Sequence, residues 1–105
     1  MRRKLSVRPR AEFDRTSHFL YLSERSPEAA LRFDDAIKAA LIKLRTDPRL
    51  GSKLELPAVT HLNLQYYRPR GFEKYLVIFR ILDDAVYVLR ILHGSQDIES
   101  AILDA

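Results

Sequence analysis

The chain has 105 residues, 47% of them hydrophobic, so we expect residues 1–105 to form a single folded domain. The absence of cysteine excludes disulfides and thiolate chemistry, which agrees with a cytoplasmic protein, and no apolar run is long enough to span a membrane. The net charge of +4 is uneven: residues 1–53 carry 13 Lys and Arg against 7 Asp and Glu, and residues 54–105 carry 5 against 7. A basic first half favours an acidic partner, nucleic acid or protein, although such charges are as often a solvated helix face.

The N-terminal region predicts an edge strand followed by a helix. Residues 3–9 alternate apolar and polar side chains and end at Pro9, which lacks the N–H that a central strand needs. Residues 10–25 predict a helix with an untidy apolar stripe, because Arg15 and His18 fall on the face expected to point inward.

The second helix has the clearest pattern in the chain, over residues 26–48. Ser26 is a suitable N-cap and Pro48 ends the helix, whereas residues 49–59 predict a loop. Two helices joined by a short loop form an antiparallel hairpin. One apolar stripe at spacings of three and four marks the buried face: Ala30, Phe33, Ile37, Ala40, Leu41 and Leu44.

The second half of the chain predicts three strands and a closing helix. The strands cover residues 61–67, 74–82 and 85–92, the last two joined by a tight turn at Asp83-Asp84, and the helix covers residues 98–105. We therefore expect an α+β fold. Its N-terminal strand and helical hairpin would pack on an antiparallel sheet of about four strands, followed by the short C-terminal helix.

The polar segment after the last strand admits two interpretations. His93 is a candidate general base that Asp97 could orient. In the alternative, which we favour, His93 ends the strand, Asp97 caps the final helix and Gly94 is a turn residue with positive φ. His18, His61 and His93 are far apart in the sequence and give no metal-ligand spacing, so we expect no metal or cofactor.

Two arginines, Arg80 and Arg90, lie on adjacent predicted strands in apolar surroundings. Each is expected to pair with a carboxylate, such as Asp97 or one from a partner, because a lone buried charge is costly. Residues 66–74 mix aromatic and basic side chains that can stack on bases and bind phosphates. The same residues also make an ordinary hairpin connection, and we do not expect direct contact with nucleic acid.

Three segments carry a resemblance to a known family. They are "RPRAEFD" (8–14), the end of the second helix "LRTDPRLG" (44–51), and the hairpin "YLVIFRILDDAVYVLRILHGSQD" (75–97). Their order and spacing cover nearly the whole chain and resemble the ParE/RelE toxin superfamily, with the hairpin's end closer to the ParE branch. The resemblance implies a toxin of a type II toxin–antitoxin system.

The branches of this superfamily imply different activities. ParE-like members inhibit DNA gyrase, whereas RelE-like members cut mRNA in the ribosome with Arg, Lys and Tyr side chains. Here Leu76 and Ile102 stand where a RelE-like chain tends to have Arg and a catalytic Tyr, and no Lys, Arg or Tyr follows Arg90. We expect a non-catalytic gyrase inhibitor. The alternatives are a ribosome-dependent mRNA endonuclease and a non-toxic relative that only binds the antitoxin.

The resemblance also implies a ParD-like antitoxin that binds along the helical hairpin and the sheet edge. An acidic, partly disordered segment suits the basic first half of this chain and would fold as it binds. A second set, Arg80, Arg90, His93 and Asp97, is a polar cluster that either contacts the target or supports the fold. The candidate antitoxin contacts are Arg8, Arg15, His18, Phe19 and Tyr21.

Overall fold

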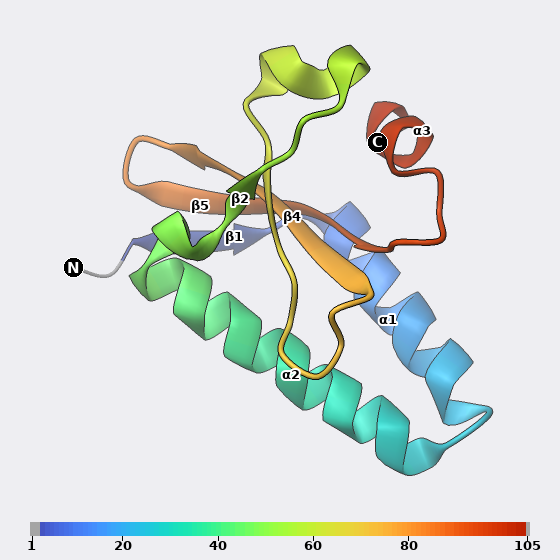
Figure 1. The fold of residues 1–105 in the computed structure, drawn as a ribbon. Coiled ribbons are helices and arrows are strands. Elements are labelled where there is room, and N and C mark those ends of the chain that lie inside the picture. Colours follow the sequence, from blue (N-terminus) through green and yellow to red (C-terminus); the bar gives the residue numbers. More distant parts are fainter. Residues whose placement is uncertain (1–2, 105) are drawn as a thin grey trace.

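A computed structural model describes residues 3–104 as a five-stranded sheet with a helical hairpin on one face, and a 3₁₀ helix and the short C-terminal helix on the other (Figure 1). Two short 3₁₀ helices, η1 (Pro48–Leu50) and η2 (Pro57–Leu62), lie in the connections. The main elements are β1 (Lys4–Val7), α1 (Pro9–Ser23), α2 (Pro27–Thr46), β2 (Ser52–Lys53), β3 (Gln65–Tyr67), β4 (Tyr75–Leu82), β5 (Ala85–His93) and α3 (Ile98–Leu103).

The predicted α+β class is confirmed, and the sheet differs from the prediction in two respects. Its order is β1-β5-β4-β3-β2, and β1 runs parallel to β5, so the sheet is mixed rather than antiparallel. The fifth strand is β2, which lies in residues expected to be a loop and pairs with β3. As predicted, β1 is an edge strand. Its partner is the last strand of the chain, which its own residue pattern cannot reveal.

The predicted strand over residues 61–67 is wrong in its first part. Pro57 starts the helix η2, and Asn63 ends it with a left-handed backbone (φ 53°), so only β3 is extended. The alternating leucines there fill the hydrophobic core and do not form a strand. Leu64 is buried and Leu62 is half-buried, and both pack beneath the sheet.

Helix α2 forms as its local signals predict. Ser26 Oγ accepts a hydrogen bond from the Ala29 N–H at 3.2 Å, and the helix ends at Thr46, two residues before Pro48. The predicted apolar stripe is buried in full. Helices α1 and α2 form the predicted antiparallel hairpin across one face of the sheet (Figure 1).

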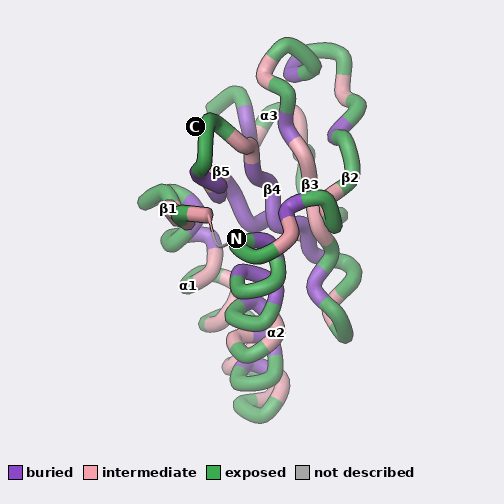
Figure 2. The backbone as a smooth tube through the Cα atoms, turned by 90° about the vertical axis from the view of Figure 1, so that its left-hand side faces the viewer, coloured by how far each residue is buried: buried purple, intermediate pink, exposed green. Residues whose placement is uncertain are grey.

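The sheet separates two hydrophobic clusters, which explains the continuous apolar run of β4. Tyr75, Val77 and Phe79 pack against the helical hairpin, whereas Leu76 and Ile78 pack against the side of η2 and α3. Buried residues accordingly concentrate along β4 and β5 and the inner side of α2 (Figure 2). A strand covered on both faces needs apolar side chains at successive positions.

A β-bulge changes the side-chain phase of β5. Ile78 pairs with Arg90 and Phe79 pairs with Val88, which leaves Leu89 as the extra residue. Val88 faces the helical hairpin before the bulge, and Ile91 faces it after the bulge. The bulge therefore directs Ile91 and His93 toward the helices at the end of β5.

Candidate binding surfaces on helix α1

Helix α1 completes the edge of β5 where β1 stops. Strand β1 pairs with β5 only as far as Val88, so the backbone of Ile91 has no strand partner on that side. Two α1 side chains, one helical turn apart, bind it instead: the Ile91 N–H donates to Asp14 Oδ2 at 3.0 Å, and the Ile91 carbonyl lies 2.8 Å from His18 Nε2. Buried backbone groups need such partners, and this explains why α1 has polar residues on its inner face.

Asp14 also forms a buried ion pair with Arg90. Arg90 Nε donates to Asp14 Oδ2 at 2.7 Å and Nη2 donates to Asp14 Oδ1 at 2.9 Å, while Nη1 donates to the Ala101 carbonyl of α3. Asp14 and Arg90 are only 7% and 4% exposed. The prediction that Arg90 pairs with a carboxylate is confirmed, but Asp97 as its partner is wrong. The pair ties α1, β5 and α3 together, and each nitrogen of Arg90 has a hydrogen-bond partner within the chain.

His18 is held as a neutral imidazole of one tautomer. A carbonyl can only accept, so the contact with Ile91 places the proton on Nε2 and leaves Nδ1 as an acceptor. Burial lowers the pKa of His18 below its ordinary value, and it outweighs the opposing effects of the Ile91 carbonyl and the Asp14 charge. Nε2 of His18 thus supports the fold, and the ring also lines a pocket.

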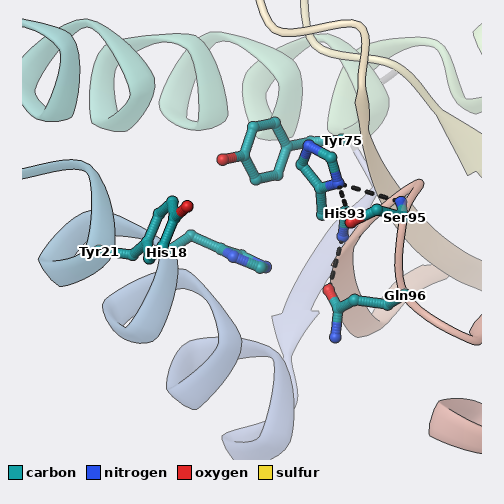
Figure 3. Close-up of a pocket in the computed structure, with 6 residues that line it drawn as sticks. All are labelled: His18, Tyr21, Tyr75, His93, Ser95 and Gln96. Carbon is teal, nitrogen blue, oxygen red and sulfur yellow. Dashed lines mark hydrogen bonds between the residues drawn. The ribbon is translucent and has the colours of Figure 1, made fainter. Parts of the chain in front are cut away.

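A pocket of about 340 Å³ opens where α1 meets the ends of β4 and β5 (Figure 3). The Tyr75 ring stands between the two imidazoles, 5.0 Å from the His18 ring and 4.8 Å from the His93 ring, in edge-to-face geometry. Burial raises the pKa of the Tyr75 hydroxyl above its ordinary value. Six residues line the pocket: His18, Tyr21, Tyr75, His93, Ser95 and Gln96.

Half of these pocket residues were singled out from the sequence. His18, Tyr21 and His93 were candidates, although they were assigned to different surfaces. Tyr75 was not among the candidates, although it lines the pocket. Tyr75 lies beside His93 because the two are paired in the β4–β5 register. That register cannot be read from the pattern of residues along the chain.

The segment His93–Asp97 is a structural corner, as favoured from the sequence. Gln96 Oε1 accepts from the His93 N–H at 2.7 Å, and the Ser95 N–H donates to His93 Nδ1 at 3.0 Å. Asp97 Oδ1 accepts from the Ser100 N–H at 3.2 Å, so Asp97 caps α3 rather than forming a dyad with His93. The Ser100 backbone and hydroxyl hydrogen bonds lower the pKa of the Asp97 carboxyl.

Gly94 occupies this corner for a different reason from the predicted one. Its backbone does not have positive φ; Gly71, at 85°, is the one glycine in residues 3–104 that does. The Gly94 N–H donates to the Lys74 carbonyl at 2.7 Å, and a Cβ on Gly94 would lie 3.2 Å from that oxygen. Close backbone approach selects glycine here.

A second surface is a groove of about 260 Å³ between α1 and α2. Arg15 Nη2 lies 2.7 Å from Asp34 Oδ1, and Lys38 Nζ lies 3.3 Å from Asp34 Oδ2. Partial burial acts to raise the pKa of Asp34, but the hydrogen bonds and charges of Arg15 and Lys38 prevail and lower it. The groove is lined by Glu12, Arg15, Thr16, Phe19 and Asp34.

Exposed apolar side chains accompany this groove on α2. Leu31 and Ile42 are 61% and 65% exposed, and their spacing places them on the same helix face as Asp34 and Lys38. Large apolar side chains grouped with charges on one face are typical of a protein-binding surface.

The predicted residue sets are therefore divided in space. Of the antitoxin candidates, Arg15 and Phe19 line the groove, whereas His18 and Tyr21 line the pocket. Arg8 is exposed at the start of α1, where its N–H donates to the Val88 carbonyl. The predicted polar cluster does not form, because Arg80 lies opposite Tyr87 in the β4–β5 ladder, near the Asp83-Asp84 turn and at the other end of the hairpin from His93. Among the residues that the structure describes, 3–104, Arg80 forms no ion pair, so the predicted pairing with a carboxylate is not found in this chain, and a carboxylate from a partner stays a prediction.

Within residues 3–104, no group of three or more His, Cys, Asp or Glu side chains is arranged to hold a metal ion. None of the helices in that range is long and apolar enough to cross a membrane.

Comparison with known proteins identifies the class and then the family. A family model described as the ParE toxin of the type II toxin–antitoxin system parDE matches residues 5–98. Toxin RelE1 of Caulobacter vibrioides is 33% identical over 90 residues, which cover 86% of this chain and 89% of that protein. These matches, on this fold, define a toxin of the ParE/RelE superfamily from a type II toxin–antitoxin system. Within that class, the chain belongs to the ParE toxin family.

A solved structure shares the fold. It is titled "Chromosomal ParDE TA system from P. aeruginosa", and it matches with a TM-score of 0.68 over 87% of this chain and 95% of that chain. The two sequences are 19% identical, so the match bears on the fold alone. It supports the arrangement of helical hairpin and sheet described above.

Proposed function

We propose that this toxin acts by binding rather than by catalysis, that DNA gyrase is its target, and that a ParD-like antitoxin neutralises it in the cytoplasm. The match to the ParE toxin family supports the target and the antitoxin, and the chemistry at the end of the sheet supports action by binding. Cleavage of a phosphodiester requires groups that stabilise negative charge on the phosphate. No Lys or Arg lines the pocket there.

The nearby arginines do not supply that charge. Arg90 is buried and bound by Asp14 and Ala101, and Arg80 is at the far end of the hairpin. Leu76 and Ile102, at the positions where a RelE-like chain tends to have Arg and Tyr, are buried in the cluster beneath the sheet. They contribute packing and have no polar group for a substrate.

The antitoxin is assigned to the groove between α1 and α2. Arg15 there is held by Asp34, and the apolar side chains of Phe19, Leu31 and Ile42 lie on the same outer side. An acidic amphipathic helix could place its apolar face over these side chains. One of its carboxylates could replace Asp34 as the partner of Arg15. The basic first half of the chain would speed its approach.

The test adds the purified toxin to gyrase and relaxed plasmid and follows supercoiling and trapped cleavage complexes. Inhibition with linear DNA after protein denaturation, reversed by the cognate antitoxin, is the expected result. Gyrase activity that stays unchanged at a large excess of folded toxin would contradict the assignment of the target.

One observation favours a second function, that of a ribosome-dependent mRNA endonuclease. The pocket brings together two imidazoles and the side chains of two tyrosines, Tyr21 and Tyr75, and these are groups that can exchange protons. Cell-free translation followed by mapping of mRNA ends tests this activity. We expect intact mRNA, because the pocket has no lining cation to stabilise the phosphate.

A further inference from the structure

A larger groove, of about 610 Å³, lies between α2 and the connection from β3 to β4. Neither the pocket nor the α1–α2 groove includes any of its residues. Nine residues line it: Ala29, Arg32, Asp35, Ala36, Ala39, Lys43, Arg70, Gly71 and Phe72.

The two grooves lie on opposite flanks of α2. At 3.6 residues per turn, Ala36 is about 200° around the helix from Asp34, and Arg32 and Lys43 share the flank of Ala36. Helix α1 lies against the flank with Asp34, and the β3–β4 connection lies against the other. A ligand in one groove therefore leaves the other groove open.

The large groove combines an apolar floor with a basic rim. Alanine methyl groups from α2 and the half-buried ring of Phe72 form the floor. Arg32, Lys43 and Arg70 supply three positive charges against the single acid Asp35. In the part of the chain that the structure describes, none of these three cations has a salt bridge. Their charges are available to a partner.

We propose that this groove binds an acidic helical segment of a partner protein, with small apolar side chains facing Ala36 and its neighbours. The lining from Ala29 to Lys43 follows α2 for about 21 Å, the length of about four helical turns. Small side chains on one helix allow a second helix to approach closely. Carboxylates at the rim would remain partly hydrated while they pair with the three cations.

The apolar floor favours protein over nucleic acid. A phosphate backbone could pair with the rim cations, but it has no apolar face to bury against the alanine methyl groups and Phe72. A peptide helix satisfies its own backbone and can bury an apolar face there. The proposal is independent of the gyrase assignment, because it concerns the chemistry of the groove and not the identity of the target.

The test measures binding of a fluorescein-labelled amphipathic peptide of about 18 residues, with glutamates on one face and alanine and leucine on the other. Fluorescence anisotropy is followed at low and high salt. The double substitution Arg32→Glu and Lys43→Glu should weaken binding about tenfold, because it reverses two rim charges. The matched control, Arg10→Glu with Lys53→Glu, changes the net charge equally at exposed sites outside the groove and should bind within about twofold of the unaltered chain.

Circular dichroism establishes that both variants are folded. Amide chemical-shift changes confined to Ala29, Ala36, Ala39 and Gly71 on peptide addition would place the helix in the groove. The proposal fails if the peptide does not bind the unaltered chain or if both double variants lose affinity equally. It also fails if a labelled DNA duplex displaces the peptide and binds more tightly, since the groove would then be a nucleic-acid site.

Discussion

Asp14 and His18 lie one turn apart on α1 and bind the same residue of β5, yet their surroundings differ. The Asp14 side chain is buried, and its two carboxylate oxygens accept hydrogen bonds from the Arg90 guanidinium and the Ile91 N–H. His18 is neutral, and its ring reaches an open pocket. Asp14 therefore serves the fold alone, whereas His18 supports the fold and also contributes to the surface of the pocket.

The largest effect is expected from breaking the enclosed pair. Asp14→Ala leaves the Arg90 guanidinium buried without a counter-ion and should lower the free energy of unfolding by about 3–5 kcal/mol. Urea unfolding followed by circular dichroism measures this. The matched control is Asp34→Ala, which removes a partly exposed pair and should cost less than about 1 kcal/mol. Equal losses in the two variants would show that the Asp14 pair is no more important than a surface pair.

An intermediate effect is expected from His18. His18→Leu keeps the volume of the side chain but leaves the Ile91 carbonyl without its donor, which should cost about 1–3 kcal/mol in the same unfolding assay. His18→Gln retains an N–H donor and is expected to recover part of the loss. A His18→Leu variant as stable as the unaltered chain would remove the edge-completing role.

The protonation of His18 should make the stability of the fold depend on pH. Its pKa is lower in the folded state than its ordinary value of 6.5, so below that value the unfolded state binds more protons. Stability should therefore be full above pH 6.5 and decline as the pH falls through the lower, folded-state pKa of His18. Unfolding midpoints at pH 7.5, 6.5 and 5.5 test this, and His18→Gln should flatten the dependence. An unchanged slope in that variant would assign the dependence to other groups.

The smallest effect on stability is expected at the α1–α2 groove, where the effect on binding is the informative one. Arg15→Ala removes a partly exposed ion pair and should change the free energy of unfolding by less than about 1 kcal/mol. If the antitoxin lies in this groove, its affinity should fall about tenfold by calorimetry. Arg10→Ala, on the same helix but outside the groove, is the control. Unchanged antitoxin affinity in Arg15→Ala would place the antitoxin elsewhere.

The parts of the fold that could be predicted are those with local causes. The N-cap of Ser26, the stripe of α2, the Asp83-Asp84 turn and the cap of Asp97 each depend on residues within a turn or two. Their signals are short-range, and the structure confirms them. The predicted antitoxin contacts remain predictions, although the structure now divides them between a groove and a pocket.

The parts that could not be predicted depend on residues far apart in the chain. Asp14 and Arg90 are 76 positions apart in the chain. They meet because β1 ends at Val7, opposite Val88, so that α1 lies beside the rest of β5. The bulge at Leu89 reverses the side of the sheet toward which later residues of β5 point. The register of β4 and β5 therefore decides which side chains line the pocket. Residue pattern alone gave Arg90 a plausible but wrong partner in Asp97, because that carboxylate is close in sequence.

We propose that this toxin acts on gyrase by binding and does not use the proton-transfer groups of the pocket. The most direct test compares gyrase inhibition by the unaltered chain with inhibition by a Tyr75→Phe and His93→Gln double variant. We expect equal inhibition of supercoiling and equal amounts of trapped linear DNA. Inhibition by the unaltered chain that is lost in a folded double variant would contradict it, because the pocket groups would then take part in the activity.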